Sequence, residues 1–406
     1  MSRLEELIAE LCPEGVEYKL LPDVLKIQRG VRVVKKDLME NGLYPVYQNS
    51  LTPLGYYDKY NCEAGTTMII VAGAAGDILY SSKRFWAADD CFYFVCNEES
   101  LISKFLYYAL MVQQRKIYSK VRTASIPRLS RINIEKIRIP IPPLPVQGEI
   151  VRILDNFIEL TAELTAELTA RKKQYAFYRD KLLSFESAIP LLPLKEVVRK
   201  SGAGATPAKG NPEYYEGGTI PWIRTQDVRF NEIEEVDSFI TEKAVEETAA
   251  KWIPENCVIV AISGATAGRC AINKIKATTN QHCLNMQIDA EKALYKYVYY
   301  CLCSKQDELI SKKQGARGDL NSSLILGTKI PVPKLEIQEK IVNVLDHFDA
   351  ICSDLKIGLP AEIEARKKQY EYYRDQLLTF AESGRMLVDR QTDRQTDRQT
   401  DRAECD

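Results

Sequence analysis

The stretch RKKQYAFYRDKLLSF at residues 171–185 decides the fold of this chain, because it occurs again as RKKQYEYYRDQLLTF at residues 366–380. Both copies place aromatic and leucine side chains at helical spacing, which predicts two related helices. Each copy follows a long stretch of dissimilar sequence. The chain is therefore predicted to consist of two half-units, each with its own variable module on a repeated frame.

The repeat begins before these helices. IPIPPLPVQGEIVRILDNF at residues 139–157 matches IPVPKLEIQEKIVNVLDHF at residues 330–348. The offset between the copies is 191 residues here and 195 residues at the RKKQY block, so the second copy carries four extra residues. We place them near DLKIGLPAEI, where a glycine and a proline interrupt the helical pattern. Proline is tolerated in the first turn of a helix, so a helix is expected to restart there.

The first copy instead contains LTAELTAELTA, in which leucine recurs every four residues. A four-residue step turns an α-helix about 40° past a full turn, which predicts a stutter in a coiled-coil seam. We expect the two repeated helices to pair and to close the chain into a ring-like, pseudo-two-fold body. The alternative is that each helix packs only on its own module. The predicted seam positions are Leu160, Leu164, Leu168, Tyr175, Tyr178, Leu182, Tyr370, Tyr373 and Leu377.

Composition limits the possible functions. The 406 residues allow two to three domains, and the net charge of −1 requires any nucleic-acid surface to be local. The eleven cysteines are scattered without a CxxC pair, as in a reduced, cytoplasmic protein. The chain begins with an expected amphipathic helix capped by Ser2 rather than with a signal peptide. Its apolar face comprises Leu4, Leu7, Ile8 and Leu11.

The two variable modules share a plan. Each has short strand-like runs broken by glycines, followed by a helix near residues 102–119 or 292–312. VAGAAG at residues 71–76 occupies the place that AISGATAG occupies at residues 261–268. Each module then ends in a basic stretch, QQRKIYSKVRTASIPRLSR in the first and SKKQGARGDLNSS in the second.

Basic loops that also carry hydroxyl and amide side chains suit contacts to DNA phosphates and base edges. The alternative for either stretch alone is a solvated charged surface, but its recurrence in both modules favours DNA contact. The candidates in the first module are Lys120, Arg122, Thr123, Arg128 and Arg131, with Gln48, Asn49 and Arg84 as secondary choices. The candidates in the second are Arg224, Thr225, Gln226, Arg269, Lys312, Lys313, Arg317 and Asn321.

We expect no intrinsic catalysis and no metal site. The tetrapeptide Asn-Pro-Glu-Tyr at residues 211–214 is similar to the amino-methyltransferase motif, but Glu213 replaces the second proline that this motif needs. No Gly-rich cofactor strand precedes it. The chain has two histidines, His282 and His347, and no visible pairing of a nucleophile with a base.

Together these features resemble the specificity subunit of Type I restriction–modification enzymes, over the chain up to about residue 383. The most specific segments are LCPEGVEYKLL, the LD-x-F and RKKQY repeats, the TAEL run, TPAKGNPEYYEGGTIPWIRTQD and ISGATAG. The resemblance implies an α/β (α+β) fold with two target recognition domains, each reading half of a split, asymmetric DNA site. It further implies that the repeated helices form an antiparallel coiled coil that sets the spacer and docks two methyltransferase (modification) subunits.

The resemblance also assigns the chemistry to partner subunits. The modification subunits use S-adenosylmethionine to methylate adenine N6, and the restriction (motor–nuclease) subunits use ATP and Mg²⁺; this chain binds no cofactor. The expected parts are an N-terminal helical segment (1–17), a first recognition domain (18–140), a central helical region (141–187), a second recognition domain (188–331), a C-terminal helical region (332–383) and a tail (384–406). Two alternatives stay open: a stand-alone bipartite DNA-binding protein, and a coiled-coil scaffold that binds protein.

Two tetrapeptide repeats carry separate expectations. One TAEL unit lengthens a helix by about 6 Å, so it should move the half-sites apart by roughly one to two base pairs. The tail DRQTDRQTDRQTDR has no apolar positions and is expected to be disordered. Repeated ACAG in the gene would encode it, so slippage by one unit would shift the reading frame. We hypothesise a phase-variable tract; the alternative is an inert tail.

Overall fold

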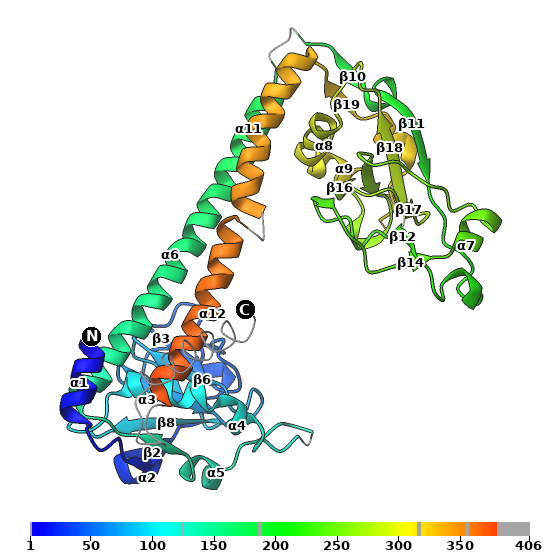
Figure 1. Cartoon of the computed structure of the whole chain (residues 1–406). Coiled ribbons are helices and arrows are strands. Elements are labelled where there is room, and N and C mark those ends of the chain that lie inside the picture. The colour runs from blue at the N-terminus through cyan, green and yellow to red at the C-terminus, as the bar shows by residue number, and fades with distance from the viewer. Residues whose placement is uncertain (1, 124, 186–188, 315–317, 354–356, 380–406) are drawn as a thin grey trace, which may run out of the picture. The chain divides into compact units, whose positions relative to one another are not determined.

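The computed structural model describes residues 2–123, 125–185, 189–314, 318–353 and 357–379 (Figure 1). The TDRQ tail and Arg317 lie outside these residues. The chain divides into two compact units. Met1–Leu164 and Ile363–Asp406 belong to unit 1, and Thr165–Glu362 forms unit 2.

The module of unit 1 has two main sheets and a two-stranded sheet, β1-β9, that joins its ends. One main sheet is four-stranded in the order β2-β8-β5-β6, and the other is three-stranded in the order β4-β3-β7. Helix α3 packs on β5 and β6 and contributes Phe105 and Tyr108 to the core. Its strands are β1 (Tyr18–Leu20), β2 (Leu25–Arg29), β3 (Tyr44–Tyr47), β4 (Gly55–Tyr57), β5 (Thr66–Ile70), β6 (Ile78–Ser81), β7 (Trp86–Ala87), β8 (Cys91–Cys96) and β9 (Arg138–Pro140). Its helices are α1 (Arg3–Leu11), α2 (Leu21–Val24), η1 (Lys35–Asp37), α3 (Ser103–Val112), α4 (Gln114–Tyr118) and α5 (Arg131–Glu135).

The module of unit 2 follows the same plan with one more strand. Its sheets have the orders β11-β18-β15-β16-β13 and β14-β12-β17, so the shared plan predicted from the sequence is observed in the strand order. Its strands are β10 (Leu191–Pro193), β11 (Val198–Ala203), β12 (Ile220–Ile223), β13 (Asn231–Ile233), β14 (Phe239–Ile240), β15 (Val258–Ala261), β16 (Cys270–Asn273), β17 (Thr278–Thr279), β18 (Cys283–Ile288) and β19 (Lys329–Pro331). Its helices are η2 (Leu194–Glu196), η3 (Pro212–Tyr214), α7 (Glu242–Glu247), η4 (Gly264–Thr266), α8 (Tyr295–Ser304), α9 (Gln306–Ser311) and α10 (Ser322–Leu326).

The repeated segments form long helices. The first copy is one helix, α6 (Leu144–Leu183), which begins in unit 1 and ends in unit 2. The second copy is split into α11 (Leu335–Ser353) in unit 2 and α12 (Leu359–Leu378), most of which belongs to unit 1. The predicted interruption and restart are therefore present, and Pro360 occupies the first turn of α12, where a missing N–H costs no helical hydrogen bond.

The same aromatic contact joins the repeated helices in both units. In unit 1, Phe157 of α6 stacks on Tyr373 of α12, with ring centroids 5.4 Å apart and planes inclined by 22°. In unit 2, Tyr178 of α6 stacks on Phe348 of α11 at 5.7 Å and 23°. Phe157 and Phe348 are repeat-related, as are Tyr178 and Tyr373. The contact is thus made twice with the roles of the two copies exchanged.

The predicted stutter at the TAEL run is wrong. Leu160 is 45% exposed, whereas Thr161 and Leu164 are half-buried. The half-buried stripe therefore passes through Phe157, Thr161 and Leu164 with alternating steps of four and three. Each four-residue step rotates a side chain by about 40°, so three successive leucines cannot all face one stripe. The Thr161 hydroxyl fits this stripe because it donates to the Phe157 carbonyl at 2.7 Å.

The N-terminal helix is confirmed with one change. Ser2 and Glu5 form a reciprocal capping box, and Leu4 lies in the core of unit 1. Leu11, which was expected on the apolar face, is 38% exposed because the helix ends there, and Cys12 is buried instead. Within the described residues, no helix is long and apolar enough to cross a membrane.

Candidate nucleic-acid interface

A parallel pair of short strands brings two loops to one edge of each module. In unit 1, β3 and β7 run parallel with Tyr47 opposite Ala87, and in unit 2, β12 and β17 run parallel with Ile223 opposite Thr279. The residues that follow two parallel strands leave the sheet on the same side. A glycine-containing turn joins each pair of loops. We call residues 48–50, 71–76 and 88–90 edge 1, and residues 224–227, 262–268 and 280–282 edge 2.

The glycine turn links edge 1 to the basic loop of unit 1. The Ala74 N–H donates to the Asn49 carbonyl at 2.9 Å, and the Gly73 N–H donates to the Pro127 carbonyl at 3.1 Å. Gly73 has a φ of 81°, and a Cβ there would lie 2.8 Å from the Asn49 carbonyl oxygen, so only glycine fits. The turn thereby places Asn49 beside the loop that carries the predicted cations.

The basic loop of unit 1 is held at its ends. Arg122 and Arg128 exchange main-chain hydrogen bonds of 2.9 and 3.1 Å. Lys120, Arg122, Thr123 and Arg128 are exposed, and no ion pair within the described residues engages the three cations among them. Their charge is therefore available to an anionic partner such as a phosphate.

Edge 2 is assembled by equivalent bonds. The Leu320 N–H donates to the Ile262 carbonyl at 2.8 Å, just as Leu129 donates to Val71 at 2.9 Å in unit 1. The Ile262 N–H in turn donates to the His282 carbonyl at 2.9 Å. Asp319, within the predicted basic stretch, accepts from the Ser263 hydroxyl at 2.6 Å. The turn at 262–268 therefore lies between the 280–282 loop and the start of α10.

Three predicted residues form the first turn of edge 2. The Arg224 N–H donates to the Asp227 carboxylate at 2.8 Å, and the Gln226 carbonyl accepts from Arg229 at 2.6 Å. Gln226 is exposed, and Arg224 and Thr225 are half-buried. Arg269 directly follows the glycine turn, and Lys313 is half-buried beyond α9.

Four other predicted residues are engaged elsewhere. Arg84 precedes β7, at the end opposite edge 1, where it pairs with Glu63 at 2.8 Å. Arg131 pairs with Glu135 within α5 at 2.7 Å, and Lys312 pairs with Glu308 at 2.6 Å. Asn321 caps α10 by accepting from the Ser323 N–H at 2.9 Å. These side chains serve local structure, so they are weaker candidates than the residues of the edges.

The sequence interpretation missed the second loop of each edge, residues 88–90 and 280–282. Gln281 accepts a hydrogen bond from the Thr206 hydroxyl, and Gln48 approaches Asp90 at 3.5 Å. These loops were overlooked because β7 and β17 are only two residues long and lack a strand-like pattern. The matching cysteines Cys91 and Cys283, which start the next strands, could have aligned the two loops.

A carboxylate on each repeated helix fixes it to its module. Asp155 of α6 accepts from Lys104 at 2.7 Å and from the Tyr108 hydroxyl at 2.5 Å. Asp346 of α11 does the same with Lys296 at 2.8 Å and Tyr300 at 2.5 Å. Burial and these hydrogen bonds raise the pKa of both tyrosine hydroxyls, which therefore remain donors. Each module is thus attached to the helical frame by the same contact.

The described residues offer no catalytic constellation. Groups of His, Cys, Asp or Glu that could hold a metal ion are absent from the described parts of the chain. Glu213 of the methyltransferase-like tetrapeptide pairs with Lys243 at 2.5 Å, and Tyr214 bonds to Glu247 at 3.1 Å. Both side chains are therefore occupied in structural contacts.

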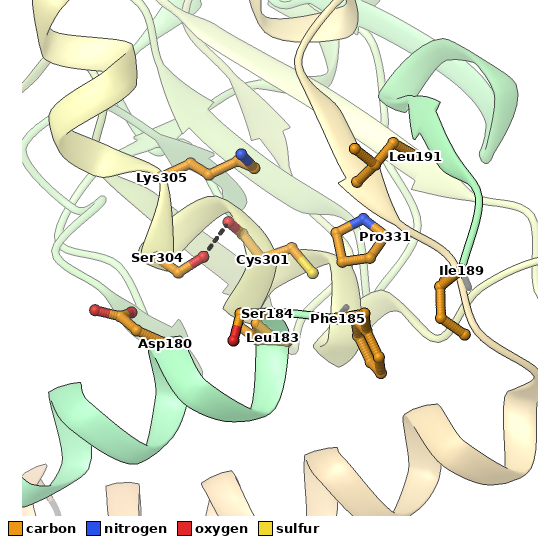
Figure 2. Close-up of a pocket in the computed structure, with 10 residues that line it drawn as sticks. All are labelled: Asp180, Leu183, Ser184, Phe185, Ile189, Leu191, Cys301, Ser304, Lys305 and Pro331. Carbon is orange, nitrogen blue, oxygen red and sulfur yellow. Dashed lines mark hydrogen bonds between the residues drawn. The ribbon is translucent and has the colours of Figure 1, made fainter. Parts of the chain in front are cut away.

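A pocket of about 600 Å³ in unit 2 lies where the end of α6 meets α8 and the β10–β19 pair (Figure 2). None of its lining residues belongs to edge 2. Burial raises the pKa of the Cys301 thiol to about 12, so the sulfur is not a nucleophile near neutral pH. The lining residues are Asp180, Leu183, Ser184, Phe185, Ile189, Leu191, Cys301, Ser304, Lys305 and Pro331.

The repeated modules on repeated helices correspond to a known family. The model of the Type I restriction modification DNA specificity domain matches residues 13–171 and 191–365, one match in each half. The chain belongs to this family of specificity subunits. As a member, it is the DNA-recognition component of a restriction–modification system, and specificity subunits are non-catalytic.

Relatives match nearly end to end. The chain is 35% identical to the specificity subunit of the Type I restriction enzymes EcoR124I and EcoR124II of Escherichia coli, over 94% of this chain and 97% of that one. It is 30% identical to a putative Type I specificity subunit of Haemophilus influenzae, over 90% and 96%. The structure of a specificity subunit from M. genitalium superposes with a TM-score of 0.58 at 18% identity, covering 89% of this chain and 96% of that chain. A chain from another type I system gives 0.61 at 16% identity, covering 90% and 97%. These structures share the fold.

Proposed function

We propose that this specificity subunit reads a bipartite, asymmetric DNA site, with edge 1 on one half and edge 2 on the other. The observation that carries the proposal is that one edge architecture is built twice, from different loop sequences, on a repeated frame. Two edges of one design but different side chains suit two half-sites of different sequence. We keep the predicted recognition domains at 18–140 and 188–331. The β1–β9 and β10–β19 pairs support these limits because each joins the two ends of its module.

Base contacts are expected from the edges, and phosphate contacts from the basic residues beside them. In unit 1, Lys120, Arg122 and Arg128 would neutralise phosphates, since their exposed charges form no ion pair with any residue that the structure describes. The amides of Gln48 and Asn49 would reach base edges. In unit 2, Arg224, Thr225 and Gln226 would fill the corresponding role. Arg269 and Lys313 would contact the backbone.

The repeated helices are proposed to form an antiparallel coiled coil that docks two modification subunits. Phe177 is 61% exposed and Tyr372 is 52% exposed, and these two residues are repeat-related. Each contacts the adjacent tyrosine of a stacked pair, Tyr178 or Tyr373. Exposed aromatic clusters are frequent anchors of protein interfaces. Two equivalent clusters support the docking of two equivalent partners.

The same helices are proposed to set the spacer, because α6 runs from unit 1 to unit 2 without a break. A change of one TAEL unit would alter its length by about 6 Å, or roughly two base pairs of DNA. The modification subunits would bring S-adenosylmethionine, and restriction subunits would bring ATP and Mg²⁺ chemistry. This chain would supply recognition and geometry.

Co-purification and methylation mapping test these proposals together. We expect this chain to form a stable complex with an adenine methyltransferase (modification) subunit, to bind duplex DNA with strong salt dependence, and to direct methylation to a split site. A stand-alone DNA-binding protein would bind the split duplex but form no such complex. A protein scaffold would form a complex without salt-dependent duplex binding. If this chain alone bound S-adenosylmethionine, the assignment of chemistry to partners would be refuted.

A further inference from the structure

Each edge holds one buried polar atom without a hydrogen-bond partner in the described parts of the chain. On edge 1 it is Oδ1 of Asp89, an acceptor, and on edge 2 it is Nε of Arg224, a donor. The third such atom, Oδ1 of Asn285, lies within β18 and not on an edge. Unpaired buried polar atoms are costly and uncommon, so their occurrence on both edges calls for an explanation.

Edge 1 holds Asp89 in a fixed turn. The Arg29 side chain donates to the Asp89 carbonyl at 2.9 Å, which anchors the main chain. Gly30, which follows β2, packs directly against this turn: a Cβ added to Gly30 would lie only 2.1 Å from the Ala88 carbonyl oxygen. The neighbouring Asp90 carboxylate is approached by Gln48 at 3.5 Å. The Asp89 carboxylate, with one oxygen buried and the side chain half-exposed, is therefore held in a fixed position.

Edge 2 is built the same way but presents donors. A Cβ on Gly204 would lie 1.8 Å from the Thr279 carbonyl oxygen, so the same close approach recurs. The Arg224 guanidinium lies 5.9 Å from the Trp222 ring centroid, and its main chain is held by Asp227. Gln281 uses its amide oxygen to accept from Thr206, which leaves its NH₂ group to donate outward. Arg224 and Gln281 are therefore positioned donors.

We propose that the two edges read bases of opposite hydrogen-bond polarity. Asp89 on edge 1 accepts from the exocyclic amine of a cytosine or adenine in one half-site. Arg224 on edge 2, supported by Gln281, donates to a base that presents acceptors, of which guanine with O6 and N7 fits a guanidinium best. This inference rests on the proposed bipartite recognition and adds which bases each edge selects. Because Asp89 Oδ1 and Arg224 Nε are themselves buried, the base contacts fall to the other carboxylate oxygen of Asp89 and to the terminal guanidinium nitrogens of Arg224, in side chains that are half-exposed.

Two substitutions separate base reading from simple charge effects. Asp89→Ala is expected to weaken binding to the cognate duplex and to relax one base pair of one half-site by roughly tenfold to a hundredfold. Arg224→Lys keeps the positive charge but lacks the forked donors. It is expected to relax one base pair of the other half-site to a similar degree, with an unchanged salt dependence.

The experiment uses the complex with the modification subunits and a panel of duplexes, each with one base pair replaced. Methylation mapping of cells that express each variant gives a second readout. Glu99→Gln is the matched control for unit 1, because Glu99 is an exposed carboxylate in the turn before α3. Lys243→Ala is the control for unit 2, because Lys243 pairs with Glu213 at the surface. Both controls are expected to keep the wild-type base preferences.

Three results would overturn the inference. A uniform gain in affinity for all duplexes in Asp89→Ala would mean that this carboxylate only repels phosphates. A uniform loss in either variant would mean a structural or phosphate role, and unchanged preference at every position would mean no contact. In each case the wild-type complex would still prefer a split site. A wild-type complex without sequence preference would instead refute the proposed function.

Discussion

Deleting Thr165–Leu168 removes one TAEL unit at the point where α6 passes from unit 1 to unit 2. Four residues of helix correspond to about 6 Å of length and about 40° of rotation beyond a full turn. Since a base pair rises about 3.4 Å, we expect the spacer between the half-sites to shorten by roughly two base pairs, with both half-site sequences unchanged.

The half-buried stripe of α6 explains why the protein that lacks Thr165–Leu168 should still fold. The deletion joins Leu164 directly to Thr169, so the residue after the junction again belongs to a TAEL-like sequence. Leu164 then takes the place of Leu168 in the stripe of unit 2 while keeping its own place in unit 1. The deletion removes one four-residue step and leaves two successive three-residue steps, which overwinds the seam locally instead of breaking it. All four residues of the stacked pairs Phe157–Tyr373 and Tyr178–Phe348 are retained, and the two α6 members of these pairs come four residues closer along the helix.

Methylation mapping of a strain that carries the deletion measures the spacer and both half-sites together. Glu167→Gln is the matched control, because it changes one exposed side chain of the same unit and keeps the helix length. Insertion of one additional TAEL unit into wild-type α6 should lengthen the spacer by the same amount. The reasoning is refuted if the half-site sequences change, or if methylation continues with the original spacer.

Three further outcomes are expected. Asp155→Ala should lower the free energy of unfolding by roughly 1.5–3 kcal/mol in denaturant titrations, because Lys104 and Tyr108 lose their partner. Asp346→Ala should lower it by less, because Lys296 keeps a second partner in Glu232 at 3.1 Å. Equal losses would contradict this difference. Phe177→Ala and Tyr372→Ala should each weaken binding of one modification subunit by at least tenfold, seen by native mass spectrometry as loss of one of two subunits; loss of neither would argue against the aromatic anchors. Burial raises the pKa of the Asp349 carboxyl above its usual value, because the ionised carboxylate is disfavoured in the folded protein. Ionised Asp349 therefore destabilises the folded state. This destabilisation is absent below about pH 4, where the carboxyl is protonated in both states, and it grows as the pH rises through the folded pKa. Asp349→Asn should therefore raise the melting temperature at pH 7 but not below pH 4, and a gain of equal size at both pH values would refute the assignment.

The sequence interpretation succeeded where a property depends on local periodicity. The helix break near Gly358, the N-cap at Ser2 and the shared order of the modules all follow from short-range patterns. It was wrong where the outcome depends on which side of a helix packs against its neighbour. Leu160 was predicted for the seam because it is a leucine in a repeat, but rotation around the helix exposes it and places Thr161 in the stripe.

The site was predicted only in part for the same reason. Gln48, Asn49 and Arg224 lie on the edges, and Arg122 and Arg128 lie on the basic loop that the glycine turn joins to edge 1. Asp89 and Gln281 were missed because strands as short as β7 and β17 acquire their parallel partners only in the folded module. Arg84 and Lys312 were chosen for their charge, but neighbouring carboxylates engage them.

The sequence by itself determined that the chain is a doubled frame with two variable modules, because repeats and helical periods are encoded along the chain. It also determined the family, since the repeat and the module motifs extend over both halves. Only the tertiary structure decided which loops share an edge and, among the residues it describes, which cations form no ion pair and which buried atoms lack partners. Those properties arise from contacts between residues far apart in sequence, and no local pattern specifies them.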